Sequence, residues 1–322
     1  MRMRTLGRLW PVSALTLGGG GIGNVWGPTS RDEAVATVRE AVDGGITLLD
    51  VAPIYGDGEA ERVIGEAYGG RLPDGVRVVT KHLLGSPPAA EVMNRLERSL
   101  DESLARMELS FVDLYVLHGY VVPDGTDEAE NRTLRSLYVD AVRPAFEQLV
   151  ERGRIGTWGI TGVAAPGEIL RALDEEPAPS AIQAITNPFD SPGAMTVSDE
   201  PARPRDIIAR AAAKGVGVMG IRAVAAGALT DGIDREVPHD DPTMVDFRRA
   251  APFRVLAQEL GESPASLAHR YALSMTGVDT VVLGVKDRAE LRECLAAESK
   301  GPLPADIVTR IDEAARAGLQ TG

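Results

Sequence analysis

The sequence of 322 residues contains a single cysteine, Cys294. One thiol cannot form an internal disulfide, so folding does not depend on an oxidising compartment, and we expect a cytoplasmic protein. Histidine is also scarce, with four residues in all, and no cysteine and histidine cluster has the spacing of metal ligands. No metal site is therefore predicted, and no residue pattern marks an activated nucleophile.

Positive charge is in short supply as well. The chain has 34 Lys and Arg against 47 Asp and Glu, which gives a formal net charge of −13. Nucleic acids and anionic membrane surfaces attract clustered Lys and Arg, so neither is expected as a partner. An anionic small ligand is still compatible with this charge, because one local basic pocket can act against the overall field.

Long apolar runs are missing too. No window of about 18 residues is apolar enough to span a bilayer. Residues 9–17, which follow two arginines, superficially resemble the apolar part of a signal peptide. Pro11 and Ser13 interrupt this stretch and no small-residue cleavage pattern follows it, so we expect no signal peptide.

The chain contains short β-branched runs that alternate with longer amphipathic segments, as in βα units with a parallel sheet. We expect eight strands, near residues 14–18, 46–50, 76–81, 112–117, 156–160, 181–185, 216–221 and 279–283. Helical patterns lie near residues 31–43, 58–69, 88–107, 133–152, 166–173, 202–214, 263–275, 287–297 and 304–317. Eight alternations without an evident linker predict an α/β fold, a single (β/α)8 TIM barrel over residues 1–322. Residues 3–13 predict an N-terminal β-hairpin that covers one end of it.

An open dinucleotide-binding sheet is the alternative fold, because Gly18, Gly20 and Gly23 match its glycine fingerprint. That fingerprint requires a helix that opens at the third glycine, whereas residues 24–28 intervene before any helical pattern. The barrel is therefore favoured. The glycine run, which includes Gly19, is expected to let the backbone pass close to a ligand or a neighbouring loop.

Four ionisable or polar residues follow three successive predicted strands. Asp50 ends the second strand, Tyr55 lies five residues later, Lys81 ends the third strand and His118 follows the fourth. In a barrel, the carboxyl ends of the strands and the loops after them carry the chemistry. Each residue alone has an ordinary structural role, but the four together predict a site that transfers a proton to a polarised oxygen.

The expected roles in this set follow from charge. Lys81 is expected to stabilise the Tyr55 phenolate and so lower the pKa of Tyr55, while Asp50 keeps Lys81 charged. His118 is expected to donate a hydrogen bond to the substrate oxygen or to relay a proton. Because the set has a proton donor and no nucleophile, we expect the other reactant, such as a hydride, to come from a cofactor.

The residues around this set resemble the aldo-keto reductase superfamily. The similar motifs are residues 45–56 and the following helix 59–65, and the resemblance extends over essentially the whole chain. Residues 6–15 and 215–229 are similar to the branch that contains bacterial sugar and carbonyl reductases and potassium-channel β subunits. The resemblance implies a (β/α)8 barrel, an extended nicotinamide cofactor and reversible reduction of a carbonyl to an alcohol.

Residue roles also carry over from the resemblance. It implies that Asp50, Tyr55, Lys81 and His118 are catalytic, with Tyr55 as the general acid. The implied cofactor-binding positions are Gly19, Gly20, Asp50, Thr161, Gln183, Ile221, Arg222, Val224, Gly284, Lys286, Arg288 and Glu293.

Several of these cofactor positions depart from the family pattern. Thr161 and Gln183 are placed at the carboxamide, but Gly162 replaces the usual asparagine. Ile221 replaces the aromatic residue that stacks on the nicotinamide, and the adjacent Arg222 could reach a phosphate.

The choice between the two nicotinamide cofactors rests on the last strand and the helix after it. Lys286 and Arg288 could neutralise a 2′-phosphate, which favours NADP(H). Glu290 stands where relatives often have Arg or Gln, and an acid there would repel that phosphate or accept a hydrogen bond from a bare ribose hydroxyl. NAD(H) is therefore possible as well. Glu293 is placed at the adenine.

The substrate is expected to be a small carbonyl compound or alcohol, in a pocket walled by the loop 119–132 and by Trp26, Ile54, Leu83 and Tyr120. Residues 188–203 and 222–246 exceed ordinary connection lengths and are expected to close over the cofactor or substrate.

Two other functions compete with an NAD(P)(H)-dependent oxidoreductase. The resemblance to channel β subunits allows a regulatory module that binds the cofactor and turns over little. A barrel hydrolase with paired carboxylates would use Asp50 and Glu59, but that scheme gives no part to Lys81 or Tyr55.

Overall fold

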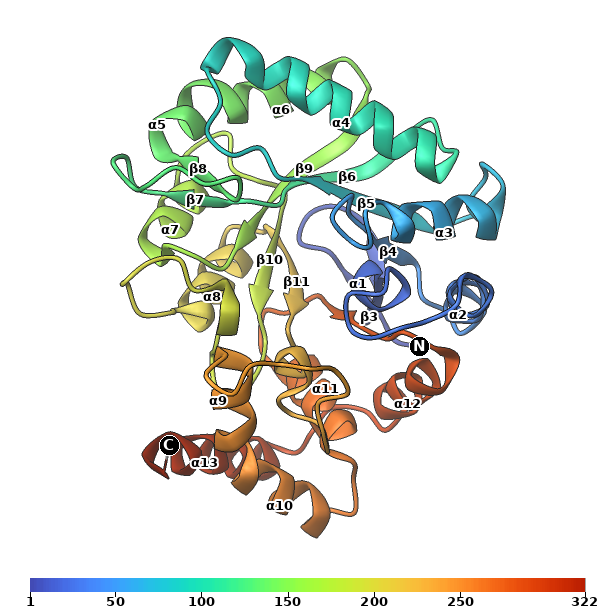
Figure 1. Cartoon of the computed structure of the whole chain (residues 1–322), viewed down its shortest axis with the longest axis vertical. Coiled ribbons are helices and arrows are strands. Elements are labelled where there is room, and N and C mark those ends of the chain that lie inside the picture. Colours follow the sequence, from blue (N-terminus) through green and yellow to red (C-terminus); the bar gives the residue numbers. More distant parts are fainter. Residues whose placement is uncertain (322) are drawn as a thin grey trace.

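Eight parallel strands close into a barrel. Figure 1 shows how the helices surround it. The computed structural model describes residues 1–321, so Gly322, the last residue of the expected domain, lies outside the described residues. The strands run in chain order around the barrel: β3 (Leu15–Gly18), β4 (Leu48–Asp50), β5 (Arg77–His82), β6 (Val112–Leu117), β9 (Ile155–Gly162), β10 (Ala181–Ile185), β11 (Gly217–Ile221) and β12 (Thr280–Leu283). All eight expected strands are confirmed, and the closed barrel excludes the open dinucleotide-binding sheet.

Helices cover the outside of the barrel and bury the apolar outer faces of its strands. Those that alternate with strands are α2 (Arg31–Asp43), α3 (Glu59–Tyr68), α4 (Val92–Met107), α6 (Arg143–Glu151), α7 (Pro166–Asp174), α8 (Pro204–Ala213), α11 (Pro264–Ser274) and α12 (Arg288–Ser299). Local sequence sets their starts: Ser30 accepts a hydrogen bond from the Glu33 N–H at the start of α2, and Ser263 caps α11 in the same way. No helix within residues 1–321 is long and apolar enough to cross a membrane.

Residues 119–151 depart from the expected single helix over 133–152. A two-stranded ribbon, β7 (Tyr120–Val122) with β8 (Arg132–Leu134), precedes α5 (Arg135–Leu137). A π-helical turn, η2 (Tyr138–Val142), then joins α5 to α6. Pro144 has no N–H to donate to the carbonyl of Asp140, which explains why the regular α-helical ladder breaks at this point.

Several further elements were not predicted separately from the sequence. The glycine run forms one short turn, α1 (Gly19–Ile22), and a single-turn helix, η1 (Ala89–Glu91), precedes α4. Two helices, α9 (Pro242–Arg249) and α10 (Ala251–Glu259), follow the long segment after β11. The last helix, α13 (Ala305–Thr321), lies beside α10 at the lower edge of Figure 1. Phe253, Leu256 and Ile311 bury the apolar faces of α10 and α13 against each other.

The expected N-terminal hairpin is confirmed and covers the amino end of the barrel. Strands β1 (Met3–Thr5) and β2 (Pro11–Ser13) pair antiparallel. Leu6 is fully buried with barrel residues such as Leu48 and Met219. The Gly7 N–H donates to the Asp279 carboxylate at 3.0 Å, next to the start of β12. The hairpin therefore closes one end of the barrel, and the carboxyl ends of the strands stay accessible at the other.

Candidate functional site

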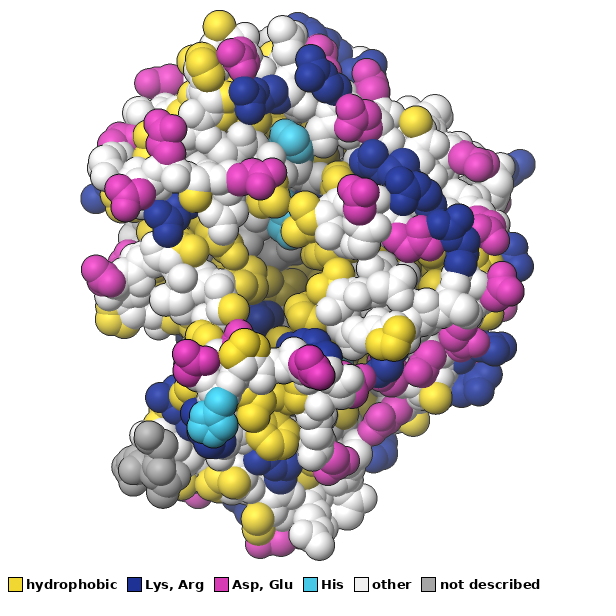
Figure 2. All heavy atoms as spheres, in the orientation of Figure 1, with side chains coloured by type: hydrophobic (Ala, Val, Ile, Leu, Met, Phe, Trp, Pro, Cys, Tyr) yellow, Lys and Arg dark blue, Asp and Glu magenta, His cyan; other side chains and the backbone are white. Residues whose placement is uncertain are grey.

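A cavity of about 760 Å³ opens at the carboxyl ends of the barrel strands. Strand ends that supply its wall carry Gly18, Asp50, His118, Thr161, Gln183, Ile221 and Leu283. Residues from the segments after β10 and β11, from α11, and from α12 and the turn before it complete the wall. Figure 2 shows this region as a hollow in the molecular surface with hydrophobic side chains around it.

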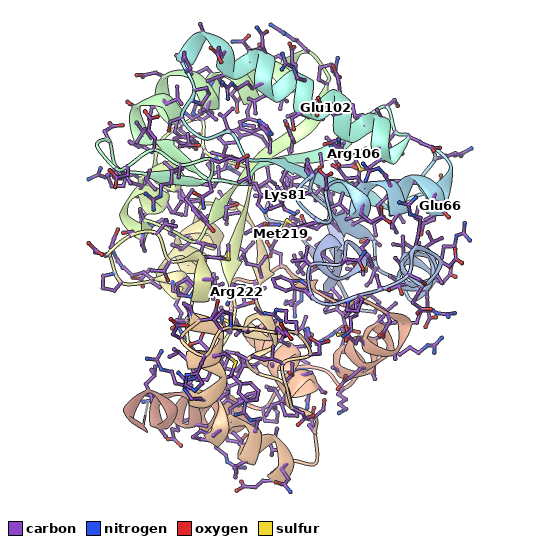
Figure 3. All side chains as sticks on the ribbon, viewed as in Figure 1. Glu66, Lys81, Glu102, Arg106, Met219 and Arg222 are labelled. Atoms are coloured by element: carbon purple, nitrogen blue, oxygen red, sulfur yellow. The ribbon has the colours of Figure 1, made fainter. Side chains whose placement is uncertain are left out.

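Three of the sequence-predicted residues form a hydrogen-bonded cluster at the floor of the cavity. Lys81 is fully buried and Asp50 is 2% exposed. The Lys81 ammonium donates to Asp50 Oδ2 at 3.0 Å, to the Val51 carbonyl at 3.1 Å and to the Tyr55 hydroxyl at 3.3 Å. Figure 3 shows Lys81 near the middle of the barrel. Successive strands thus bring an acid, an ammonium and a phenol into contact.

Burial and charge oppose each other in this cluster. Burial alone would lower the pKa of Lys81, but the Asp50 carboxylate and the Tyr55 hydroxyl raise it above its ordinary value. Lys81 therefore stays cationic. Burial also raises the pKa of Tyr55, and this outweighs the opposite effect of Lys81. The pKa of Tyr55 is therefore raised, whereas the sequence-based expectation was a lowered pKa. The loss of hydration of the phenolate has a larger effect than its attraction to the Lys81 ammonium.

His118 completes the set beside Tyr55. The two rings meet edge to face, with centroids 5.7 Å apart and planes at 85°. Burial, and then the charge of Lys81, hold the pKa of His118 well below its ordinary value. Its Nδ1 atom is buried and has no hydrogen-bond partner within residues 1–321. The ring is therefore neutral at pH 7 and has one N–H to donate.

Gln183 and Thr161 line the cavity next to this cluster. Gln183 Nε2 donates to both Asp50 oxygens, at 3.0 and 3.1 Å. The Thr161 hydroxyl lies 3.1 Å from the carbonyls of Leu117 and His118. A side chain at Gly162 would overlap the Ile182 side chain, so the asparagine common at this position does not fit unless Ile182 moves.

The glycine run allows close packing of two aromatic residues into the cavity wall. A Cβ at Gly19 would lie 2.9 Å from Tyr55 Cδ2, and one at Gly20 would overlap the Trp26 indole. Gly284 approaches the same indole, since a Cβ there would lie 3.1 Å from Trp26 Cδ1. The backbone of the run therefore passes close to neighbouring loops, one of the two outcomes expected from the sequence.

The wall opposite the cluster is rich in carboxylates. Lys286 Nζ donates to Asp234 Oδ2 at 2.6 Å and also contacts Glu290. Burial would lower the pKa of Lys286, but these two carboxylates raise it. Glu293 also lines this wall and accepts a hydrogen bond from the Ser263 hydroxyl.

Arg288 lies apart from that wall. Its Nε and Nη2 atoms donate to the Glu33 carboxylate of α2 at 3.0 and 2.8 Å. It is not among the residues that line the cavity, whereas Lys286 and Glu293 are. Of the two cations expected to neutralise a phosphate, Lys286 therefore lines the cavity, and Arg288 pairs with Glu33 outside it.

Only some of the residues expected to contact the substrate line the cavity. Trp26 lines the cavity, with the Arg235 guanidinium 5.3 Å from its ring centroid. Ile54 is 50% exposed, and Ile54, Leu83 and Tyr120 are not among the lining residues. Val224, expected at the cofactor, does line the cavity.

Sequence reasoning did not name several residues of the wall, which include Ala194, Met195, Asp234, Arg235 and His269. The unusual length of residues 188–203 and 222–246 is the signal that predicts a covering role for the first four. His269 lies inside α11, where the sequence offers no signal beyond an ordinary buried helix position.

Comparisons with known proteins agree with this architecture. The sequence model of the Aldo/keto reductase family matches residues 14–316. L-galactose dehydrogenase of Arabidopsis thaliana is 28% identical over 92% of this chain and 88% of that protein. The aldo-keto reductase YhdN of Bacillus subtilis is 27% identical over 52% of this chain and 47% of that protein.

Two solved structures share the fold. Glycerol dehydrogenase of Gluconobacter oxydans superposes with a TM-score of 0.73 at 22% identity, over 99% of this chain and 96% of that one. An aldo-keto reductase of Bacillus halodurans in its holo form gives 0.72 at 22% identity, over 98% and 97%. At this identity the likeness supports the barrel alone.

Proposed function

Because the chain belongs to the aldo/keto reductase family, which implies carbonyl oxidoreduction with a nicotinamide cofactor, we propose that it interconverts an aldehyde, ketone or aldose with its alcohol. One observation carries this proposal. The buried Lys81 ammonium hydrogen-bonds both Asp50 and Tyr55 at the floor of the cavity. A structural lysine needs one acid partner, whereas a lysine held against a phenol is suited to stabilise a developing phenolate.

Tyr55 acts as the general acid in reduction and as the general base in oxidation. When its hydroxyl gives a proton to the carbonyl oxygen, negative charge develops 3.3 Å from the Lys81 ammonium. This attraction is stronger in the transition state than in the ground state, so it lowers the barrier. Asp50 keeps the ammonium in place and charged. The neutral His118 ring donates its N–H to the carbonyl oxygen and positions it for Tyr55.

The cavity wall fits an extended cofactor, because it encloses about 760 Å³ and runs from Asp50 and Tyr55 to Lys286 and Glu293. Gly19, Gly20 and Gly284 all line it, and any Cβ there would meet Tyr55 or Trp26. A bound nicotinamide cofactor supplies or accepts the hydride. The residues that would hold it are Gly19, Gly20, Thr161, Gln183, Ile221, Val224, Gly284, Lys286 and Glu293.

NADP(H) is the cofactor that the sequence favours, through Lys286 and Arg288. The contacts of both cations weaken that preference. Lys286 already has two carboxylate partners, and Arg288 is paired with Glu33. A 2′-phosphate would have to compete with Asp234 and Glu290 for Lys286, so we propose that NAD(H) binds at least as well as NADP(H).

Replacement of Tyr55 tests the proposed chemistry. Tyr55→Phe removes the acidic proton and keeps the ring, so kcat for aldehyde reduction should fall about 10²- to 10⁴-fold, as expected for loss of a general acid. The dissociation constant for the cofactor should change less than about twofold, because Phe preserves the ring that packs against Gly19. Steady-state kinetics and cofactor fluorescence titration measure the two quantities.

Tyr68→Phe is the matched control for this experiment. Tyr68 lies on α3 and is not among the residues that line the cavity, and its hydroxyl donates to the Val38 carbonyl at 3.5 Å. Full activity of Tyr55→Phe would contradict the assignment of the acid. Wild-type protein that binds the cofactor tightly but oxidises one equivalent without turnover would favour the regulatory module.

A further inference from the structure

Arg222 is the unpaired cation of the cavity wall. Three Lys or Arg residues line the cavity, and two of them are engaged by protein groups. Lys286 is held by Asp234 and Glu290, and Arg235 donates to the Ala226 carbonyl at 2.9 Å. The Nε and Nη2 atoms of Arg222 are buried, and they have no hydrogen-bond partner within residues 1–321.

The neighbouring residues nevertheless hold the Arg222 side chain in a defined position. Its backbone is in the left-handed region, at φ 57°, which an arginine adopts only at a cost in free energy. The Arg222 carbonyl accepts hydrogen bonds from Asn187 Nδ2 at 3.3 Å and from the Ala225 N–H at 2.8 Å. Gly193 leaves room for the guanidinium, because a side chain there would overlap Nη2. These contacts fix where the cation lies without neutralising it.

The acids nearest to Arg222 have other partners. Asp246 accepts a hydrogen bond from the Ser191 hydroxyl at 2.6 Å and lies 3.7 Å from Arg249. Asp241 caps α9 through the Thr243 N–H at 2.7 Å. Burial lowers the pKa of Arg222, but a guanidinium stays charged in proteins. A buried charge without a partner is unfavourable, so the arrangement favours an anionic ligand.

The location of Arg222 indicates which ligand carries that anion. Figure 3 shows Arg222 between the end of β11 and α9. Its neighbours are Gly193, from the segment after β10, and Tyr120, from the segment after β6. Tyr120 is close enough to both Arg222 and Tyr55 for each to affect its pKa. Lys286 follows β12, the strand that pairs with β11, and its ammonium is held by Asp234 and Glu290. An anion on Arg222 is therefore placed near Gly193 and Tyr120.

We propose that Arg222 binds an anionic oxygen group of the substrate, so that the preferred substrates are aldehydes or ketones that carry a carboxylate or a phosphate. Sequence reasoning assigns this arginine to a cofactor phosphate, which has the same chemistry. Substitution of Arg222 distinguishes the two ligands. A substrate anion predicts weaker substrate binding, and a cofactor phosphate predicts weaker cofactor binding. This inference rests on the proposed carbonyl reduction.

Matched pairs of substrates test the proposal. 4-Carboxybenzaldehyde and its methyl ester, and 4-oxobutanoate and its methyl ester, differ mainly in charge. The wild-type protein should reduce each carboxylate with the higher kcat/KM. Arg222→Met should lower kcat/KM for the carboxylates about 10- to 100-fold, mostly through KM, and leave the esters within about twofold. Arg222→Lys, which keeps the charge, should recover part of the loss.

Controls separate this role from a structural one. Arg248→Met removes one exposed arginine from the neighbouring helix α9 and should leave every substrate unchanged. Arg222→Met should melt no lower than wild type, because Met fills the space without a buried charge. Cofactor dissociation constants should not change. A tenfold weaker cofactor affinity with equal losses for acids and esters would overturn the inference and assign Arg222 to a cofactor phosphate.

Failure of the proposed function gives a different result. If the wild-type protein reduces no member of either pair, carbonyl reduction of these compounds fails, and calorimetric titration with 4-carboxybenzyl alcohol then decides the inference. Binding that Arg222→Met weakens at least tenfold supports an anion site. Equal binding to the two proteins, or none to either, overturns it.

Discussion

At the scale of single residues, burial decides what the cluster under the cavity can do. Asp50, Tyr55, Lys81 and His118 are recognisable from their places after predicted strands. Their protonation states cannot be recognised in the same way, because the pKa of each group depends on how much hydration it loses and on which charges lie within a few ångströms. Lys81 stays charged through its contact with Asp50, while Tyr55 and His118 stay neutral at pH 7 because burial opposes their charged forms.

This distribution of charge predicts the pH dependence. The raised pKa of Tyr55 keeps its proton in place below that value, so kcat/KM for reduction of a neutral aldehyde should be constant from about pH 6 to about pH 9 and fall at higher pH. Alcohol oxidation needs the deprotonated phenol and should rise with pH. His118, with its lowered pKa, should add no inflection near its ordinary value. A steady-state pH profile with reduced cofactor at saturation measures this, and an inflection near pH 6.5 would contradict the neutral ring.

At the scale of elements, one contact joins the long segment after β11 to the turn before α12. Asp234 of that segment and Glu290 of α12 converge on Lys286. Arg288, two residues further on, forms its ion pair with Glu33 of α2 instead. With the proposed function, we expect the choice between NAD(H) and NADP(H) to depend on how these two segments share the Lys286 ammonium.

Removal of one carboxylate from this contact should change cofactor preference. Glu290→Gln keeps the size of the side chain and frees Lys286 from one of its two acids, so the affinity for NADP(H) relative to NAD(H) should increase about tenfold. Fluorescence titration with both reduced cofactors measures the ratio. Glu259→Gln, on the exposed side of α10, is the charge-matched control. An unchanged ratio in Glu290→Gln would show that this acid does not face the cofactor's ribose.

Element boundaries show where local sequence is sufficient. The strands are short apolar runs between glycines and polar turns, and all eight lie within two residues of their expected positions. The expected helix over 133–152 is wrong in its first part, because β8 pairs residues 132–134 with β7, and such pairing depends on a partner that sequence periodicity does not identify. Helices α9 and α10 were missed for a related reason: their apolar faces are short and are buried by elements distant in the sequence, which include α13.

At the scale of the whole molecule, one end of the barrel is closed by packed apolar side chains and the other carries the candidate site. The hairpin β1–β2 closes the amino end with the fully buried Leu6. The cavity, the cluster and Arg222 all lie at the carboxyl end. Stability and activity should therefore respond separately to changes at the two ends.

Leu6→Ala tests this separation. Deletion of a fully buried leucine should lower the free energy of unfolding by about 2–5 kcal/mol, since the rigid barrel cannot close the space that is left. kcat/KM per folded molecule should not change, because the site lies at the opposite end. Met3→Ala on the same hairpin removes a side chain that is 52% exposed and should change the stability by less than about 0.5 kcal/mol. Loss of activity in folded Leu6→Ala would contradict the separation.

The linear chain is enough to predict the barrel and the four residues of its candidate site. Eight alternating apolar runs and amphipathic segments allow few folds, and a parallel barrel places all residues that follow its strands at one rim, so Asp50, Tyr55, Lys81 and His118 meet. Contacts between segments far apart in the sequence set the rest. Arg288 pairs with Glu33, Ile182 fills the space beside Gly162, and the loops around Arg222 bury its Nε and Nη2 atoms, which have no hydrogen-bond partner within residues 1–321. Such contacts depend on distances of a few ångströms between segments that are far apart in the sequence. Residue types and their spacing do not give these distances, which are set only when the fold is packed.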